Sequence, residues 1–358
     1  MSPFNKLLDK LICLECNQDP LAFARVNRGN GILHCSHCGN IHLLRDGVFI
    51  FLPNKYEIKS PYREFLTRHR DFLREHPVFD RLIKAKIDKL PAKSKAKWED
   101  EDIQYWDEQY AKEPLVKGVE TYQITGSRLF PREQQLFKIL RKRFKKDDFI
   151  FEIGSGDART VRRLFSPITY DYNYIVSDYS LEAMKYLRQL YRGRGNVFCF
   201  QCLGDKLPFR DDSLNAIICL GVLHHMPKKE THLAGLINKL VPNGLLLGYE
   251  SYEREYQLPH AIKEFVEGIF EPAHSHHEER INYRNANKLF SRFGELINEY
   301  HEYSPTRTLM VKLFSNQIEK SAFVTKLCLA LDQFTIQTIG RIWKLFGAGG
   351  YFFVFRKN

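Results

Sequence analysis

The chain has 358 residues, of which 44% are hydrophobic, which is enough for full cores in two domains and their connections. Its formal net charge of +11 is compatible with an anionic partner. No stretch of eighteen uncharged apolar residues occurs, which excludes a spanning helix, and the first residues lack the apolar run of a secretory signal, so we expect a cytoplasmic protein.

Two CxxC pairs near the amino terminus predict a metal site. They are separated by eighteen residues and consist of Cys13, Cys16, Cys35 and Cys38. Four thiolates on two tight turns complete the tetrahedral coordination of a zinc ion. A segment of about fifty residues has too small a hydrophobic core to be stable without a bound metal of this kind. Disulfides are less favoured because no secretory signal precedes the cysteines. We therefore expect a zinc-ribbon domain at residues 1–53 with one structural Zn²⁺.

The other four cysteines are interpreted as small buried hydrophobic residues: Cys199, Cys202, Cys219 and Cys328. Cys199 and Cys202 also have CxxC spacing. On a strand, however, their side chains point to opposite faces, which argues against a shared metal.

Residues 54–125 are predicted to form a basic, mostly helical linker. Residues 55–97 hold thirteen Lys and Arg against six Asp and Glu. A solvated helical face and a surface for RNA or anionic lipid both fit this charge. Its cations recur mostly at helical spacing: Arg63, Arg68, Arg70, Arg74, Lys84, Lys86 and Lys89.

A glycine turn after an apolar strand is the most informative local pattern. Phe149 to Ile153 reads as a strand that Glu152 helps to close, and Gly154 and Gly156 follow it before a helix-compatible run. Glycines allow the backbone to approach a ligand closely. Such a turn also occurs as a plain connector between a strand and a helix, so alone it does not identify a ligand.

Strands and helices alternate after this turn, which predicts a parallel, doubly wound α/β sheet. Expected strands are 174–180, 197–203, 211–220 and 245–249, with a helix at 233–240 and later strands at 297–303 and 350–356.

The order of motifs resembles class I S-adenosylmethionine-dependent methyltransferases. The matching pieces are Glu152-Ile-Gly-Ser-Gly-Asp, Ser177-Asp-Tyr-Ser, Gly204-Asp-Lys-Leu-Pro-Phe, Leu223-His-His and Pro242-Asn-Gly-Leu-Leu-Leu. The resemblance covers roughly residues 130–250 and implies a seven-stranded, mostly parallel, Rossmann-like sheet within residues 126–358. Two positions depart from the family pattern: Ala158 replaces a frequent third glycine, and Asn215 replaces an aspartate that begins the fourth strand.

The resemblance also implies roles for individual residues. Gly154 and Gly156 would admit the methionine and ribose portion of the cofactor, with Glu152 ordering the turn. Asp178 would accept the ribose hydroxyls, and Asp205 the adenine amine, with Leu203 against the ring. As an alternative, either aspartate is a helix N-cap.

Two histidines are candidates for chemistry. His224, with His225 beside it, follows the fourth strand, where doubly wound sheets bind ligands, and imidazole titrates near neutral pH. A packing role under the cofactor is the alternative. His274 belongs to a His- and Glu-rich segment and is the candidate polar contact to the acceptor.

The ribbon has a resemblance of its own. Residues 5–53, with both cysteine pairs and Arg45-Asp-Gly-Val-Phe-Ile-Phe-Leu-Pro53, are similar to the small zinc-ribbon activator that partners methyltransferases in eukaryotes. This implies a supporting role for the metal.

Acceptor choice is expected to reside in a substrate cap at 251–281 and an apolar helical insertion at 304–346. Three functions stay open at this point: a methyltransferase of a small-molecule, sugar or lipid-linked acceptor, an RNA methyltransferase, and a non-catalytic cofactor-binding partner protein. The acceptor atom cannot be read from the sequence.

Overall fold

The computed structural model of the chain describes residues 1–54, 57, 59–91, 131–156, 172–204, 206–226, 229–252, 288, 290–302 and 349–358, together with the helical residues 327, 330, 331, 334 and 338. Two compact units divide it, one containing residues 1–119, 145–215 and 238–241, the other residues 120–144, 216–237 and 242–358. Each unit is treated by itself below.

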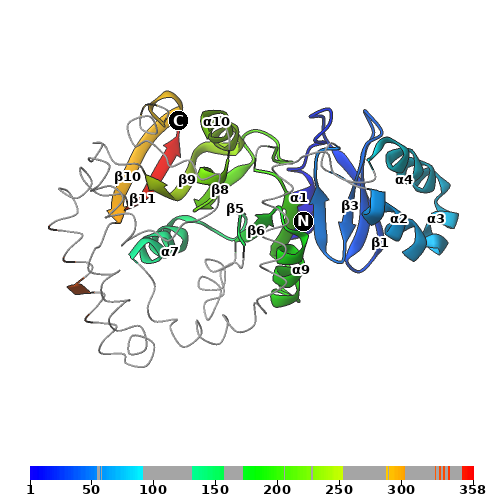
Figure 1. Cartoon of the computed structure of the whole chain (residues 1–358), viewed down its shortest axis with the longest axis horizontal. Helices are drawn as coiled ribbons and strands as arrows, with labels where there is room; N and C mark the ends of the chain where they lie inside the picture. Colours follow the sequence, from blue (N-terminus) through cyan, green and yellow to red (C-terminus); the bar gives the residue numbers. More distant parts are fainter. Residues whose placement is uncertain are drawn as a thin grey trace, which may run out of the picture. The chain divides into compact units, whose positions relative to one another are not determined.

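The described part of the chain contains both helices and strands (Figure 1). In chain order they are α1 (Pro3–Leu8), β1 (Leu21–Asn27), β2 (Asn30–Cys35), β3 (Ile41–Arg45), β4 (Val48–Phe51), α2 (Lys59–Arg68), α3 (Arg70–Glu75), α4 (Pro77–Lys89), α7 (Pro131–Arg143), β5 (Phe149–Ile153), β6 (Asn173–Asp178), α9 (Leu181–Leu190), β7 (Val197–Cys202), β8 (Leu214–Leu220), η1 (Leu223–His225), α10 (Lys229–Lys239), β9 (Leu240–Tyr252), β10 (Gly294–Glu302) and β11 (Gly349–Lys357).

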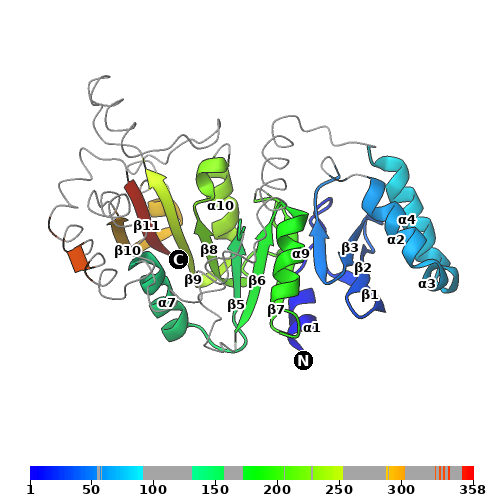
Figure 2. The same cartoon turned by 60° about the horizontal axis from the view of Figure 1, so that its bottom comes forward.

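Strands β5 to β11 confirm the predicted α/β sheet. They form the runs β7-β6-β5 and β8-β9-β11-β10. In the first unit, β5 pairs with β6 and β6 with β7, both in parallel. In the second unit, β11 pairs antiparallel with β9 and with β10. Strands β5, β6 and β7 are mostly apolar, and their side chains are buried on both faces. Helix α9 lies along β6 and β7 (Figure 2).

The ribbon strands extend the sheet of the first unit. Strands β1 to β4 form antiparallel pairs, and β4 then pairs in parallel with β7, from Val48 opposite Cys199 to Phe51 opposite Cys202. The ring of Phe200 on β7 stacks on Phe49 and Phe51, with centroids 4.7 and 5.6 Å apart. The ribbon strands and β7 therefore share one hydrophobic core.

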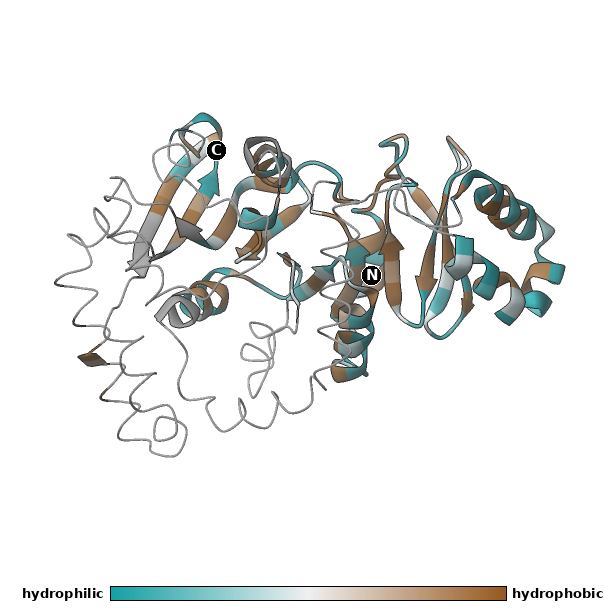
Figure 3. Cartoon of the chain, in the orientation of Figure 1, coloured by the Kyte–Doolittle hydropathy of each residue, from teal (hydrophilic) through white to brown (hydrophobic). Residues whose placement is uncertain are grey.

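Helices α2, α3 and α4 pack together beside the ribbon strands (Figure 1). Tyr62, Phe65, Leu73 and Ile83 are buried in one cluster with side chains from β2, β3 and β4. The helices are amphipathic, as the mixture of teal and brown segments in Figure 3 shows. The described helices of the segment expected as a basic linker, residues 59–89, thus form a packed layer on the ribbon.

Lys86 corrects one detail of the predicted basic face. Its side chain is only 4% exposed and forms an ion pair with buried Glu57. Its Nζ also donates to Asn40 Oδ1 at 2.8 Å, and Tyr62 donates to Glu57 at 2.6 Å. Burial raises the pKa of Glu57, an effect that Lys86 opposes. Lys86 therefore stabilises the core between α4 and the ribbon and cannot contact a partner.

The second unit has a densely packed antiparallel end. Phe352, Phe353, Val354 and Phe355 of β11 are buried. A Cβ at Gly248 on β9 would lie 2.0 Å from the Phe353 ring, so only glycine fits there. Within the described residues, every helix is too short or too polar to cross a bilayer.

Candidate active site

The two glycines of the turn after β5 both have positive φ. Gly154 and Gly156 have φ values of +60° and +52°, in the left-handed region that side chains with a Cβ rarely occupy. Ser155 lies between them and is buried. The turn therefore requires glycine for its backbone shape, whatever approaches it.

Two serines join this turn to the end of β6. The Ser155 N–H donates to the Ser177 carbonyl at 2.7 Å, and the Ser177 N–H donates to Ser155 Oγ at 3.1 Å. Both hydroxyls donate to the carbonyl of Glu152, at 3.2 and 2.9 Å. Sequence reasoning missed this pair of serines, which positions the glycine turn against the neighbouring strand.

Asp178, the last residue of β6, also bonds to the glycine turn after β5; this contact between the end of β6 and the turn is called the junction below. One carboxylate oxygen accepts the Gly156 N–H and the other the Ser180 N–H, each at 2.9 Å. The N-cap of α9 is Ser180, whose Oγ accepts the Ala183 N–H, so capping does not account for Asp178. Its side chain is half-buried. A carboxylate can accept about four hydrogen bonds, so these two bonds are compatible with a ribose diol as a further partner.

Glu152 is buried, and its carboxylate accepts a hydrogen bond from Tyr174 on the neighbouring strand β6. The Tyr174 hydroxyl donates to Glu152 Oε2 at 2.8 Å, and burial keeps the pKa of Tyr174 well above its ordinary value, so it remains a donor. Both the backbone carbonyl and the carboxylate of Glu152 therefore have donors. A place beside the sulfonium remains a prediction.

Leu203 is partly buried directly after β7, and it packs with Tyr179 against the cluster formed by the ribbon and helices α2 to α4. The residues directly after β6 and β7, Tyr179 and Leu203, therefore contact this cluster. Asp205, His274 and Ala158 lie outside the described residues, as does most of the cap at 251–281 and of the insertion at 304–346.

Asn215 retains the hydrogen bond that its departure from the family pattern put in doubt. Its Oδ1 accepts the Phe149 N–H at 2.8 Å. An amide oxygen accepts as a carboxylate does, without the charge. The start of β5 is therefore fixed in the same way as an aspartate would fix it.

His224 has a buried partner in the second unit. Its Nδ1 lies 2.8 Å from Glu250 Oε2, and Glu250 is fully buried at the end of β9. Glu250 Oε1 accepts the Val222 and Leu223 N–H groups at 2.8 and 2.7 Å. An ionised Glu250 carboxylate would only accept, with Nδ1–H of His224 as its donor. Sequence reasoning missed Glu250, because nothing distinguishes it from an ordinary acid at a strand end.

The four amino-terminal cysteines come together as predicted. Their sulfur atoms all lie within 4.8 Å of one another. The Sγ atoms of Cys13 and Cys38 are 3.6 Å apart, as are those of Cys16 and Cys35. Tetrahedral zinc with Zn–S bonds of about 2.3 Å has sulfur–sulfur edges of roughly 3.8 Å, so the cluster has the size of a zinc site.

The two cysteine turns are built alike. The Asn17 N–H donates to the Cys13 carbonyl and the Gly39 N–H to the Cys35 carbonyl, both at 2.9 Å. Asn17 and Gly39 each have positive φ, +58° and +72°. Asn and Gly tolerate this conformation best, so the residue after each CxxC lets the turn close and direct both thiols inward.

Comparison with known proteins gives a family for the central segment. The family described as "Methyltransferase domain" matches residues 151–248. No curated protein matches the chain.

Solved structures with a similar fold include phosphoethanolamine N-methyltransferase 2 from Haemonchus contortus, bound to phosphomonomethylethanolamine and S-adenosylhomocysteine. It has 14% identity and a TM-score of 0.46, over 67% of this chain and 57% of that one. Geranyl diphosphate methyltransferase in complex with SAM has 11% identity and a TM-score of 0.44, over 63% of this chain and 84% of that one.

This chain therefore matches little more than half the length of the Haemonchus enzyme. At such identities the likenesses concern the fold and carry no argument about the acceptor. The family match covers the glycine turn, Asp178, His224 and the strands that present them. Residues 151–248 thus match the methyltransferase domain family.

Proposed function

We propose that the chain transfers the methyl group of S-adenosylmethionine to a small-molecule, sugar or lipid-linked acceptor. The observation that carries the cofactor assignment is the junction between the glycine turn and Asp178. Gly154 and Gly156 would approach the methionine and ribose portion, and Asp178 would accept the ribose hydroxyls. Leu203 and Asp205 are proposed for the adenine.

The cofactor supplies an electrophilic methyl group on a sulfonium. The protein's part in a direct displacement is to align the acceptor and to remove a proton when the acceptor is a hydroxyl. His224 is our candidate for that base, because it follows β8 and its imidazole is held in place by buried Glu250. Glu250 would act through His224, as a positioning residue.

An apolar acceptor, or one carrying a lipid, is supported by the insertion. Leu327, Leu331 and Phe334 have the spacing of one helical face, yet they are 48%, 39% and 63% exposed. Exposed apolar side chains on one face often belong to an interaction surface. We propose that this insertion and the cap at 251–281, with His274 as a polar contact, form a wall of the acceptor pocket.

The packed state of helices α2 to α4 weakens the case for RNA. Arg68 pairs with Asp46, Arg74 with Asp71 and Lys84 with Asp80, while Lys86 is buried. These cations are therefore partly neutralised by the protein's own acids. RNA methylation remains the alternative that the test below must separate.

We propose that the cysteine cluster holds one structural Zn²⁺. Four ligands from the protein close the coordination sphere, so a zinc here has no position for substrate. Its role would be to fix the two turns that begin and end the β1–β2 hairpin, and through β4 to support β7.

The acceptor is tested with methyl-labelled S-adenosylmethionine and fractionated cell extract. We expect label in the lipid or small-molecule fraction, lost in His224→Ala and retained when Arg68, Arg70 and Arg74 are changed to Glu. His274→Ala should lower turnover without changing cofactor affinity. Label in RNA that falls steeply with salt and requires the three arginines would contradict the proposed acceptor class.

A further inference from the structure

A cavity of about 550 Å³ lies in the first unit, lined by the ribbon turns and by the end of α9 with the loop after it. Five of its lining side chains are basic and one is acidic: Arg28, Lys185, Arg188, Arg192, Arg194 and Asp46. This size is within the range of small-molecule sites. The charge is contributed by three separate parts of the chain.

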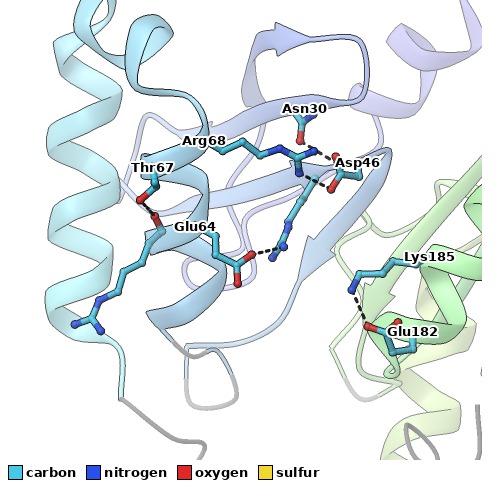
Figure 4. A network of polar contacts seen from close by, with 9 residues as sticks. Asn30, Asp46, Glu64, Thr67, Arg68, Glu182 and Lys185 are labelled. Atoms are coloured by element: carbon cyan, nitrogen blue, oxygen red, sulfur yellow. Dashed lines mark hydrogen bonds and ion pairs between the residues drawn. The ribbon is translucent and has the colours of Figure 1, made fainter. Parts of the chain in front are cut away.

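The acids near this cavity are already paired. Asp46 accepts from Arg68 at 2.9 Å, and Glu182 accepts from Lys185 at 2.6 Å, as Figure 4 shows. No ion pair links Arg28, Arg188 or Arg192 to an acid of the described residues. Cations gathered in this way repel one another, so an anion that enters the cavity lowers the electrostatic energy.

The glycine at position 47 allows Arg188 to lie against the backbone of a ribbon turn. Arg188 lies directly on Gly47, where an added Cβ would be 2.1 Å from its Nε. The Gly47 N–H donates to the Gly29 carbonyl at 2.7 Å, which joins the two ribbon turns. On the other side Gly193 has a φ of +92° and open space around it. Arg188 is half-buried, so its guanidinium is held in place more firmly than a surface side chain.

The cavity is separate from the predicted cofactor site. Helix α9 begins after Ser180, next to Asp178, and Arg188 lies on its last turn. A helix of ten residues is about 15 Å long. Arg188 therefore lies about 10 Å along α9 from its first residue, and Arg192 follows the end of the helix.

We propose that this cavity binds a small anion of the diphosphate class, either free pyrophosphate or the diphosphate group of a nucleotide or other small molecule. Guanidinium groups bind phosphate oxygens through paired hydrogen bonds, and several of them converge here on a space of suitable size. The ligand would hold the ribbon turns and α9 together, because its contacts come from both.

Two other interpretations explain less. Basic residues in the last turn of a helix are favoured by the helix dipole, but this does not account for Arg28, which comes from the β1–β2 turn. Single-stranded RNA is usually held by a basic groove with aromatic platforms. The described residues that line this cavity include no aromatic side chain.

The test is calorimetry of inorganic pyrophosphate against the full chain at constant ionic strength. We expect saturable one-to-one binding, with inorganic phosphate binding more weakly. The variant Arg188→Gln/Arg192→Gln should bind pyrophosphate at least about tenfold more weakly, because charge-assisted bonds are lost. The matched control Arg63→Gln/Arg81→Gln removes the same charge from exposed positions on α2 and α4 and should bind as the wild type does.

Arg28→Gln, on an exposed turn, provides a second variant should the α9 variant fold poorly, and it should also weaken binding. Saturating S-adenosylmethionine should leave pyrophosphate binding unchanged. Equal binding by the arginine variants and the control would overturn the proposal, as would displacement of pyrophosphate by the cofactor. A short RNA that binds through Arg28 and Arg188 while pyrophosphate does not would instead assign the surface to nucleic acid.

Discussion

Two strand-end junctions, one in each unit, are built on the same plan and differ in burial. At the first, Asp178 at the end of β6 accepts an N–H from the glycine turn after β5. At the second, Glu250 at the end of β9 accepts two N–H groups from the loop after β8. Asp178 is half-buried, whereas Glu250 is fully buried.

Because the two acids differ in burial, we expect them to have different roles. A half-buried carboxylate that already orders the glycine turn can still be reached by a polar ligand. A fully buried one is limited to its protein neighbours, which here include the loop backbone, His224 and the Cys219 thiol. We therefore expect the first junction to govern cofactor affinity and the second to govern stability and turnover.

The largest expected effect comes from the ribbon. Cys35→Ser should abolish zinc binding and unfold the ribbon, because a small domain depends on its metal. Since β4 pairs with β7, the loss should also reduce cofactor affinity at the first junction. Metal analysis and calorimetry would show both effects. Cys199→Ala, a buried thiol outside the cluster, is the control and should retain the zinc; full zinc content in Cys35→Ser would refute the site.

At the second junction, Glu250→Ala should lower the free energy of unfolding by about 3 kcal/mol or more, because it leaves one buried and one part-buried N–H group without their acceptor. Chemical denaturation would measure the change. Glu295→Ala removes an exposed acid on β10 that pairs with Arg356, and it should change stability by no more than about 0.5 kcal/mol. Equal effects of the two substitutions would remove the distinction between buried and exposed acids.

Glu250→Gln should act mainly on turnover. The amide can still accept from the loop, but it no longer stabilises a protonated His224, so the general base weakens. We expect slower methyl transfer with a shifted pH–rate profile and a cofactor affinity close to that of the wild type. A profile identical to wild type would mean that Glu250 only supports the loop.

The smallest effect is expected for Tyr174→Phe, which removes the hydroxyl that donates to Glu152. Hydrogen bonds to charged groups contribute about 1.5 to 3 kcal/mol, and thermal unfolding should show a loss in this range. Phe fills nearly the same volume, so packing is preserved. An unchanged melting temperature would show that Glu152 is ordered by its other contacts alone.

Local patterns in the sequence predicted the strands from Phe149 onward, the two cysteine turns and the position of Asp178 at a strand end, because turns and strand periodicity depend on neighbouring residues. The pairing of β4 with β7 could not be predicted, since it joins segments about 150 residues apart through backbone groups that every sequence has. Lys86 was misjudged for a related reason: its charge is visible in the sequence, but its buried partner Glu57 depends on how α4 packs.

The central claim is that the first junction binds S-adenosylmethionine. Calorimetry of this cofactor with the wild type, Asp178→Asn and Glu250→Gln tests it most directly. We predict one-to-one binding by the wild type, a loss of about 1.5 to 3 kcal/mol in folded Asp178→Asn, and nearly unchanged affinity in Glu250→Gln. Absence of binding by the wild type, or equal affinity of the wild type and Asp178→Asn, would contradict the assignment.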